Sequence, residues 1–345
     1  MKILLTGSHG YIGSVCGRVL SEAGHDVVGL DTLLYRDCDL PSTQTRSLST
    51  LDVDVRDVTP AELAGFDAIV HLAALSNDPI GDFSPELTRE INADATISLA
   101  RAARDAGVRR FVFSSSCSMY GASSESAVDE GAPLKPLTAY AESKVRSEEA
   151  LAELAGPDFA PVSMRNATAY GVSTRLRVDL VLNNLVGWAH ATGKVKIMSD
   201  GSPWRPLIHI EDISRAALAA AEAPEDLIRG EAFNVGRDDE NYQVRQLGDI
   251  VQETVSGSEI EYAGSGDPDP RSYRVDFGKL RRAFPDLELT WTARAGAQEL
   301  VDAYRAADLT LEQFESDRYT RLKRLRLLLD SGRVDHTLRW KQNAA

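Results

Sequence analysis

The sequence predicts an α/β protein built on a Rossmann-type, doubly wound parallel sheet, with a smaller α+β substrate-binding lobe at its C-terminal side. Three observations support this prediction. Short apolar segments alternate with helix-length segments through the first half of the chain, which is typical of parallel sheets. A glycine-rich turn at 7–13 joins the first such pair, and Tyr140 and Lys144 stand four residues apart in a later helical segment.

The alternation loosens past Gly171, which indicates a second architecture there. We expect residues 1–171 to form the cofactor-binding domain, with 206–236 returning to it. The substrate lobe is expected over 172–205 and 237–300, and an amphipathic basic helical extension over 306–345. A chain of 345 residues can bury a core large enough for such an arrangement.

Composition excludes several classes of partner. A formal net charge of −14 argues against nucleic acid, whose phosphates select Lys and Arg, and against an anionic membrane surface. Cys16, Cys38 and Cys117 are too few and too widely spaced for a disulfide framework or a metal cluster, so we expect no metal and a cytoplasmic location. The chain enters a strand at once, so no signal peptide or membrane span is expected.

The first strand, Lys2–Thr6, leads directly into the glycine-rich turn and a helical pattern. Gly7 permits a tight turn, Gly10 lets a pyrophosphate approach the backbone, and Gly13 permits close packing of helix on strand. Tyr11 and Ile12 complete the turn. The helix then presents free N–H groups to phosphates, so this stretch predicts a dinucleotide site.

The second strand, Asp26–Leu30, ends in Asp31, eighteen residues past Gly13. A carboxylate there can accept both ribose hydroxyls of an adenosine and repels a 2′-phosphate, so NAD is favoured over NADP. The alternative is that Asp31 merely opens a loop. A third strand is expected at Leu51–Val55, with Asp54 and Val55 at its end beside the adenine.

A fourth strand, Asp67–His71, precedes Leu72, Ala73 and Ala74, whose small side chains let a cofactor pass close to the backbone. Ser114, Ser115 and Ser116 end a later strand. Ligands of doubly wound sheets bind at the carboxyl ends of the strands, so one groove can collect all of these residues.

Tyr140 and Lys144 share one face of their predicted helix. An ammonium beside a phenol favours the phenolate, so we expect the pKa of Tyr140 to fall from its usual ~10 toward neutrality. Such a phenol can take the proton of an alcohol while a hydride leaves the same carbon, and a serine hydroxyl at a strand end can hold the oxygen. Alone, this spacing would indicate a surface helix, and the neighbouring motifs reverse that interpretation.

With these residues the chain resembles the extended short-chain dehydrogenase/reductase family, in its nucleotide-sugar epimerase and dehydratase branch. The resemblance runs from residue 1 to about 300. Its further motifs are Asp54-Val55-Arg56-Asp57, His71-Leu72-Ala73-Ala74, Tyr120-Gly121, Ala169-Tyr170-Gly171, Trp204-Arg205-Pro206 before Asp212, Phe233-Asn234-Val235-Gly236, and Arg271 with Asp276.

The resemblance implies that Tyr140 is the general base, that Lys144 lowers its pKa and holds the nicotinamide ribose, and that Ser116 polarises the substrate oxygen. The implied cofactor contacts are Gly7, Gly10, Tyr11, Ile12, Gly13, Asp31, Asp54, Val55, Leu72, Ala73, Ala74, Ser114, Tyr140 and Lys144. The predicted contacts to a nucleotide-diphosphate sugar are Ser76, Ser116, Ser118, Thr168 and Trp204, with Arg205 and Arg271 matching the family's diphosphate-binding arginines. Arg177 and Asn183 are further candidate contacts. Trp204 is as compatible with the core as with the base.

The resemblance also implies a homodimer through a four-helix bundle, here formed by about Pro85–Ala106 and Leu137–Leu154. Apolar residues recur at helical spacing along the first of these segments, at Ile91, Ala95, Leu99 and Ala102. The alternative is that this stripe faces the protein's own sheet.

The chain departs from the 4,6-dehydratases of the branch, which place an Asp-Glu pair directly after the catalytic hydroxyl residue. Cys117 and Ser118 occupy those places here. A thiol with a pKa of ~8.5 is a poor acid for expelling a hydroxyl, and Cys117 is as compatible with inert packing. Epimerisation at C4 is therefore expected ahead of 4,6- or 5,6-dehydration, and a non-catalytic NAD-binding regulatory protein is the remaining alternative.

Two other features are unusual for the family, the stretch Leu75-Ser76-Asn77-Asp78-Pro79 after the two alanines and Thr168 where many members carry Asn. Both indicate an uncommon hexose or a nucleotide other than UDP or dTDP. Beyond residue 306, Arg318, Arg321, Lys323, Arg324 and Arg326 interleave with leucines. This pattern predicts an amphipathic helix with a basic face. We expect it to dock on the acidic body or on a dimer partner, and the alternative is a basic lid over the nucleotide phosphates.

Overall fold

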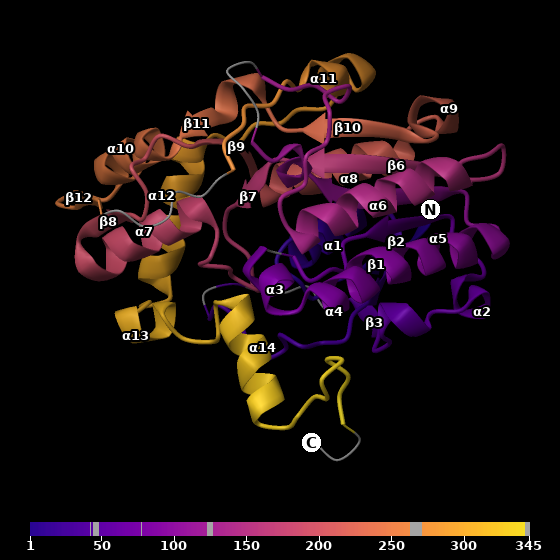
Figure 1. Ribbon diagram of the computed structural model, residues 1–345, viewed down its shortest axis with the longest axis horizontal. Coiled ribbons are helices and arrows are strands. Elements are labelled where there is room, and N and C mark those ends of the chain that lie inside the picture. Colours follow the sequence, from indigo (N-terminus) through magenta and orange to yellow (C-terminus); the bar gives the residue numbers. More distant parts are fainter. Residues whose placement is uncertain (42, 44–47, 77, 123–126, 263–270, 342–345) are drawn as a thin grey trace.

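The computed structural model describes residues 1–41, 43, 48–76, 78–122, 127–262 and 271–341. A seven-stranded sheet forms its centre (Figure 1), in the order β10-β6-β5-β4-β1-β2-β3, and every neighbouring pair is parallel. Its strands are β1 (Lys2–Thr6), β2 (Asp26–Leu30), β3 (Ser49–Leu51), β4 (Ala68–His71), β5 (Arg110–Ser116), β6 (Ala160–Asn166) and β10 (Glu231–Val235). The chain therefore has the predicted Rossmann-type sheet. Because β1 has β2 on one side and β4 on the other, the strand order reverses there and opens a crevice at the carboxyl ends.

Helices cover both faces of this sheet, and the alternation of side chains along the strands explains why. Ile3 and Leu5 of β1 face a core that contains the buried sides of α1 (Gly13–Glu22) and α8 (Ile210–Glu222). Leu4 faces the opposite core, which includes α2 (Pro60–Leu63), α5 (Ala95–Asp105) and α6 (Ala139–Leu154). A strand buried on both faces reads as a nearly continuous apolar run, as residues 3–5 of β1 and 68–70 of β4 do.

The expected third strand at Leu51–Val55 is shorter and earlier than predicted, because β3 ends at Leu51. Asp54 caps a short 3₁₀ turn, η1 (Val55–Asp57), by accepting a hydrogen bond from the Arg56 N–H at 2.9 Å. Aspartate side chains compete in this way with extended pairing, which a reading of apolar periodicity misses.

The expected helix at Pro85–Ala106 is interrupted. It consists of α4 (Pro85–Arg89), a π-helical turn, η2 (Glu90–Asp94), and α5. Within the π turn, the Asn92 side chain accepts from the Leu75 N–H at 2.8 Å and donates to the Leu75 carbonyl at 3.1 Å. The turn thus fixes the loop after β4, and π turns of this kind are frequent at functional sites.

The stripe expected to face a dimer partner instead packs inside the chain. Ala95, Leu99 and Ala102 are at most 8% exposed and belong to the core against β1, β4 and β5. The spacing was read correctly as helical, but it cannot distinguish the protein's own sheet from a partner.

Several elements that follow β6 in the chain form a second group with its own core, at the left of Figure 1, while β10 and α8 belong to the central sheet and its covering helices. It contains a three-stranded sheet, β11-β9-β7, and a two-stranded sheet, β12-β8. These elements are β7 (Thr168–Tyr170), β8 (Lys194–Ile197), β9 (Trp204–His209), β11 (Asn241–Gln243), β12 (Glu259–Tyr262), α7 (Val181–Thr192), α10 (Val244–Thr254) and α12 (Ala293–Ala306). The remaining short elements are spread along the whole chain. They are α3 (Asp78–Phe83), η3 (Cys117–Tyr120), α9 (Glu225–Ile228), η4 (Asp238–Glu240) and α11 (Gly278–Ala283).

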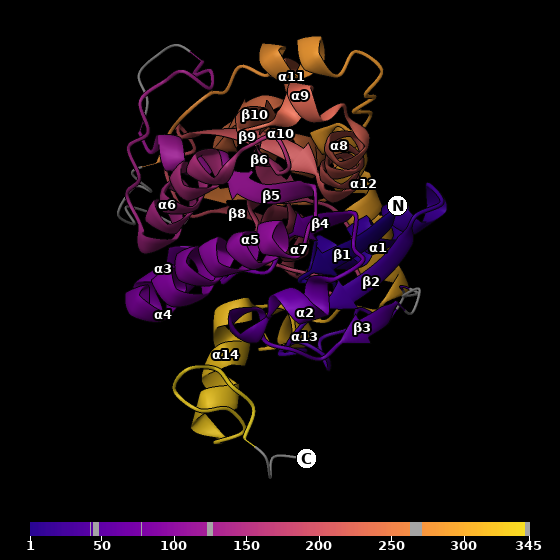
Figure 2. The ribbon, with the colours of Figure 1, turned by 90° about the vertical axis from the view of Figure 1, so that its right-hand side faces the viewer.

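The end of the chain forms α13 (Leu311–Phe314) and α14 (Arg321–Asp330). Figure 2 shows α14 below α3 and α4. The segment after it returns to the main body, where Trp340 donates to the Thr32 carbonyl at 2.6 Å. The leucines of α14 pack on the same chain, as described below. Among the described residues, no helix combines the length and apolar character that a membrane crossing requires.

Candidate active site

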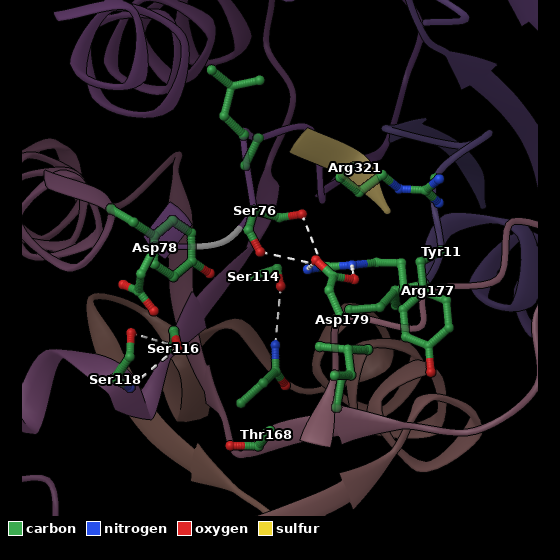
Figure 3. A pocket seen from close by; sticks show the side chains of 18 of the residues that line it. Tyr11, Ser76, Asp78, Ser114, Ser116, Ser118, Thr168, Arg177, Asp179 and Arg321 are labelled. Carbon is green, nitrogen blue, oxygen red and sulfur yellow. Dashed lines mark hydrogen bonds and ion pairs between the residues drawn. The ribbon is translucent and has the colours of Figure 1, made fainter. Parts of the chain in front are cut away.

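A cavity of about 690 Å³ opens at the carboxyl ends of the central strands. Its lining comes from the glycine-rich turn, the ends of β2, β4 and β5, the start of α6, the second group of elements, and the chain end near Arg321. Figure 3 shows Asp78, Ser116 and Ser118 on one side of this cavity and Tyr11, Arg177 and Arg321 on the other. The volume and the convergence of polar side chains are typical of a small-ligand site.

The turn at 7–13 leaves no space for side chains at its glycines. Gly7 has φ +70°, and a Cβ there would lie 2.8 Å from the Ala73 nitrogen. A Cβ on Gly13 would lie 2.0 Å from the Gly7 oxygen. Helix α1 begins at Gly13 without a side-chain cap at Ile12, so its positive end faces the cavity uncapped. A bare turn before an uncapped helix fits the diphosphate of a dinucleotide.

Asp31 is held in place for a ribose. One carboxylate oxygen accepts from the His9 N–H at 2.9 Å and the other from the Leu33 N–H at 2.8 Å. Burial raises the pKa of this carboxyl, and the two N–H donors oppose that rise. Each oxygen keeps a further lone pair for a hydroxyl, so the residue fits the ribose of NAD.

Tyr140, Lys144 and Ser116 meet at the inner end of the cavity. Thr138 caps α6 by accepting from the Ala141 N–H at 3.2 Å, which places Tyr140 in the first turn. The Lys144 ammonium donates to the Ser114 carbonyl at 2.7 Å and lies 5.8 Å from the centre of the Tyr140 ring. Ser116, the last residue of β5, lies near the phenol and lowers its pKa, and its hydroxyl donates to the Ser118 hydroxyl at 3.0 Å.

The pKa of Tyr140 contradicts the expectation from the sequence. Burial, aided by the Asp78 carboxylate, raises the pKa of Tyr140 to about 12, although the Ser116 hydrogen bond opposes the rise. Burial also lowers the pKa of Lys144 to about 7. The ammonium lies against the Phe113 ring, 4.5 Å from its centre. The four-residue spacing in the sequence shows that Tyr140 and Lys144 share one face of the helix. It does not show how deeply the surrounding fold buries them, and burial decides the direction of both pKa shifts.

Asp78 is a pocket residue that sequence reasoning did not single out. It accepts a hydrogen bond from the Thr138 hydroxyl at 2.5 Å and forms an ion pair with Arg271. It thus brings a negative charge close to Tyr140 and holds one of the predicted diphosphate arginines. Its only signal in the sequence was its place in the unusual stretch after Ala74.

Replacing Asp78 by Asn is expected to shift the acid limb of the pH profile of kcat/KM to lower pH, by up to about one unit. The carboxylate raises the pKa of Tyr140, so its removal lets the phenol lose its proton at lower pH. Steady-state rates across pH measure the shift. Asp82→Asn, on the exposed side of the same helix, is the control. An unchanged limb in the Asp78 variant would contradict this role.

Three of the predicted substrate arginines line the cavity. Arg177 forms a two-point ion pair with Asp179, at 2.8 and 3.0 Å, and donates to the Ser76 hydroxyl at 3.1 Å. Arg205 donates to the Trp204 carbonyl at 2.8 Å and to the Arg271 carbonyl. These cations stand in a chain of net charge −14, so the cavity concentrates positive charge where a diphosphate would bind.

Three predicted site residues lie outside the cavity lining. The Cys117 thiol is fully buried, donates to the Arg165 carbonyl at 3.0 Å, and has a pKa raised by burial, so it packs the core and does not serve as an acid. Asn183 is also fully buried and donates to the Tyr11 hydroxyl at 3.0 Å and the Arg177 carbonyl at 2.8 Å. The Trp204 ring lies against Arg274, 5.1 Å away. Asn183 and Trp204 do not themselves line the cavity. The position of a residue in a motif does not show whether its side chain reaches the cavity.

The remaining predicted residues all line the cavity. They are Gly7, Gly10, Tyr11, Ile12, Gly13, Asp31, Asp54, Val55, Leu72, Ala73, Ala74, Ser76, Ser114, Ser118 and Thr168. Sequence reasoning missed Asn166, which donates to the Ser114 hydroxyl at 3.0 Å. Its own carboxamide oxygen is buried without a hydrogen-bond partner among the described residues. Such an unpaired acceptor at the inner end fits a ligand that donates there, as the nicotinamide carboxamide can.

A dinucleotide crevice that ends at a Tyr, a Lys and a Ser defines the short-chain dehydrogenase/reductase class. Within it, the chain matches the NAD dependent epimerase/dehydratase family over residues 3–236, and it belongs to that family. The predicted branch and its dependence on NAD are thereby confirmed.

Individual relatives agree with this assignment. The chain is 32% identical to the UDP-glucose 4-epimerase of Corynebacterium glutamicum over 310 residues, which are 85% of this chain and 91% of the relative. Among solved structures it resembles MoeE5 in complex with UDP-glucose and NAD, at 28% identity and a TM-score of 0.74, covering 88% and 99% of the two chains. It also resembles the dTDP-glucose 4,6-dehydratase DesIV of Streptomyces venezuelae with NAD bound, at 27% identity and a TM-score of 0.74, covering 88% and 97%.

Proposed function

We propose that the protein is an NAD-dependent epimerase that inverts C4 of a nucleotide-diphosphate sugar. The observation that supports this most directly is the composition of the inner end of the cavity. Tyr140, Lys144 and Ser116 are assembled there, while the places after Ser116 hold a buried thiol, Cys117, and a hydroxyl, Ser118. Epimerisation needs the first three groups and no adjacent carboxyl pair.

In this proposal Tyr140 takes the proton of the C4 hydroxyl while Ser116 holds its oxygen. Bound NAD would accept the hydride from C4 and give it back after the sugar has turned, and its positively charged nicotinamide would lower the pKa of the nearby phenol. Lys144 is oriented by the Ser114 carbonyl, 5.8 Å from the centre of the Tyr140 ring, and in this proposal it holds a hydroxyl of the nicotinamide ribose. Arg205 and Arg271 hold the diphosphate, so the oxidised sugar can turn about that link and present its other face. Tyr140 then returns the proton.

A sugar 4,6- or 5,6-dehydratase is the second candidate, and Asp78 is the observation that favours it. This carboxyl lies in the cavity near Tyr140. It could take the place of the carboxyl that dehydratases use to expel a hydroxyl. Its two oxygens are already engaged, one by the ion pair with Arg271 and the other by the hydrogen bond from Thr138, which favours epimerisation.

Isotope labelling distinguishes the two reactions. We expect UDP-glucose carrying deuterium at C4, incubated with the enzyme, to give the C4 epimer with that deuterium retained. Because C5 is not touched, no solvent deuterium should enter it in ²H₂O. Mass spectrometry and proton NMR of the products report both positions. Exchange at C5 with a stable keto or ene product would establish the dehydratase instead, and the absence of any turnover with UDP-, dTDP-, CDP- and GDP-sugars would favour the non-catalytic alternative.

We also propose a homodimer formed by α4–α5 and α6, and a cytoplasmic location. Helices α5 and α6 pack side by side on one face of the sheet (Figure 2), which is the arrangement that a four-helix interface requires. Free thiols at Cys16, Cys38 and Cys117 suit a reducing compartment. Sedimentation velocity distinguishes a dimer near 75 kDa from the 37.6 kDa chain.

A further inference from the structure

The segment 311–341, which we term the tail strap, lies over the carboxyl ends of β2 and β3. Leu325, Leu328, Val334 and Leu338 of the strap form one buried cluster with residues from the loops after β2 and β4 and from α3 and α4, namely Leu34, Leu75, Ile80 and Leu87. None of the four strap residues is more than 4% exposed. Burial of these four apolar side chains stabilises the contact between the strap and the main body.

Polar contacts attach the strap to the two loops that flank the adenosine side of the cavity. The Trp340 indole N–H donates to the Thr32 carbonyl, directly after Asp31, at 2.6 Å. Arg56, the partner of Asp54, donates to the Thr337 carbonyl at 2.9 Å. Thr32, Asp54 and Arg56 themselves line the cavity, as do Thr320, Arg321, Leu322 and Leu338 of the strap. The strap is therefore a wall of the site.

Arg321 occupies an unusual position in this wall. Its side chain is only 3% exposed, and its guanidinium lies 4.1 Å from the centre of the Tyr35 ring. One terminal nitrogen donates to the Arg175 carbonyl at 2.7 Å. The other, Nη1, is buried without a hydrogen-bond partner, and no ion pair to Arg321 occurs among the described residues.

A buried cation without a carboxylate is costly unless a ligand supplies the missing acceptor. Figure 3 places Arg321 on the same side of the cavity as Tyr11 of the glycine-rich turn and Arg177. Arg177 is already paired with Asp179, so Arg321 is the cation there that lacks an anionic partner among the described residues. An anionic phosphate oxygen is an acceptor that would satisfy the unpaired Nη1 of Arg321 and balance its charge.

We propose that the tail strap closes the adenosine half of the dinucleotide pocket and that Arg321 donates a hydrogen bond to the diphosphate of bound NAD. This inference rests on the proposed function in that it requires NAD in the crevice. It adds a cofactor contact from a part of the chain that lies outside the family match at 3–236. A nucleotide sugar also carries a diphosphate, so the test treats the two ligands separately.

The test measures affinity directly, by isothermal titration of NAD, and separately of UDP, into protein stripped of its cofactor. The variants are Arg321→Gln and, as a control on the exposed face of the same helix, Arg326→Gln. We expect Arg321→Gln to weaken NAD binding roughly tenfold to hundredfold, the value of a charge-assisted hydrogen bond, and to leave UDP binding within about twofold. Arg326→Gln should leave both affinities unchanged.

Hydrogen–deuterium exchange on the unaltered chain provides a second measurement that needs no variant. We expect NAD to slow exchange in the strap, over 321–341, and UDP to leave it unchanged. Unchanged NAD affinity in Arg321→Gln, a loss of UDP affinity in its place, or a strap whose exchange ignores NAD would each overturn the inference. Failure of the unaltered protein to bind NAD at all would overturn the proposed function instead.

Discussion

Replacing Tyr140 by Phe is expected to lower kcat by roughly a hundredfold to ten-thousandfold, the usual contribution of a positioned general base. The phenol lies in the cavity beside Ser116, and the Lys144 ammonium is 5.8 Å from the centre of its ring. Phenylalanine keeps the ring and its packing but has no oxygen to take the C4 proton. Steady-state kinetics with a nucleotide sugar measures the loss, and the NAD content of the purified variant should match that of the parent.

The matched control is Tyr262→Phe, at an exposed tyrosine of β12. It should retain full activity. If Tyr140→Phe kept a tenth or more of the parental kcat while its NAD content was unchanged, Tyr140 would not be the base. A variant that lost NAD as well would point to a role in binding.

Replacing Glu148 by Ala is expected to lower the free energy of unfolding by about 3–5 kcal/mol, since it leaves a buried guanidinium without its carboxylate. Glu148 of α6 forms a two-point ion pair with Arg165 of β6, and both side chains are only 8% exposed. Arg165 also donates to the Tyr120 hydroxyl at 3.0 Å. The pair fixes the helix that carries Tyr140 and Lys144 against the sheet.

Chemical denaturation measures this effect, with Glu149→Ala, at the exposed neighbour on the same helix, as the control. The double variant Glu148→Ala with Arg165→Met should recover much of the lost stability, because it removes the unpaired charge as well. If the single Glu148 variant were as stable as the Glu149 variant, the ion pair would contribute nothing to the attachment of α6.

The sequence was sufficient for the parts of the fold that depend on local pattern. Strands β1 and β2 have the predicted bounds, and α6 begins two residues after the predicted start, because a buried parallel strand and a capped helix each leave a clear periodic signature. The glycine-rich turn was equally clear, since steric exclusion at Gly7 and Gly13 leaves few other residues possible.

Features that depend on distant contacts could not be predicted in the same way. The π turn at Asn92 forms because its side chain bonds to Leu75 in another segment. The pKa of Tyr140 was predicted in the wrong direction because burial and Asp78, which lies 62 residues earlier in the chain, outweigh a lysine one turn away. Ser116 and Cys117 are adjacent in sequence, yet at the end of the strand Ser116 lines the cavity and Cys117 is buried in the core.

The tail strap also sets the order in which the pocket is assembled during synthesis. The strap contributes Thr320, Arg321, Leu322 and Leu338 to the cavity lining, and the other described lining residues all precede Thr320 in the chain. The strap therefore leaves the ribosome after those other lining residues. The central sheet and its glycine-rich turn can therefore fold and take up a dinucleotide through an open side, before translation delivers the segment that closes it. A nascent chain stalled before residue 311 should then exchange NAD faster than the finished protein.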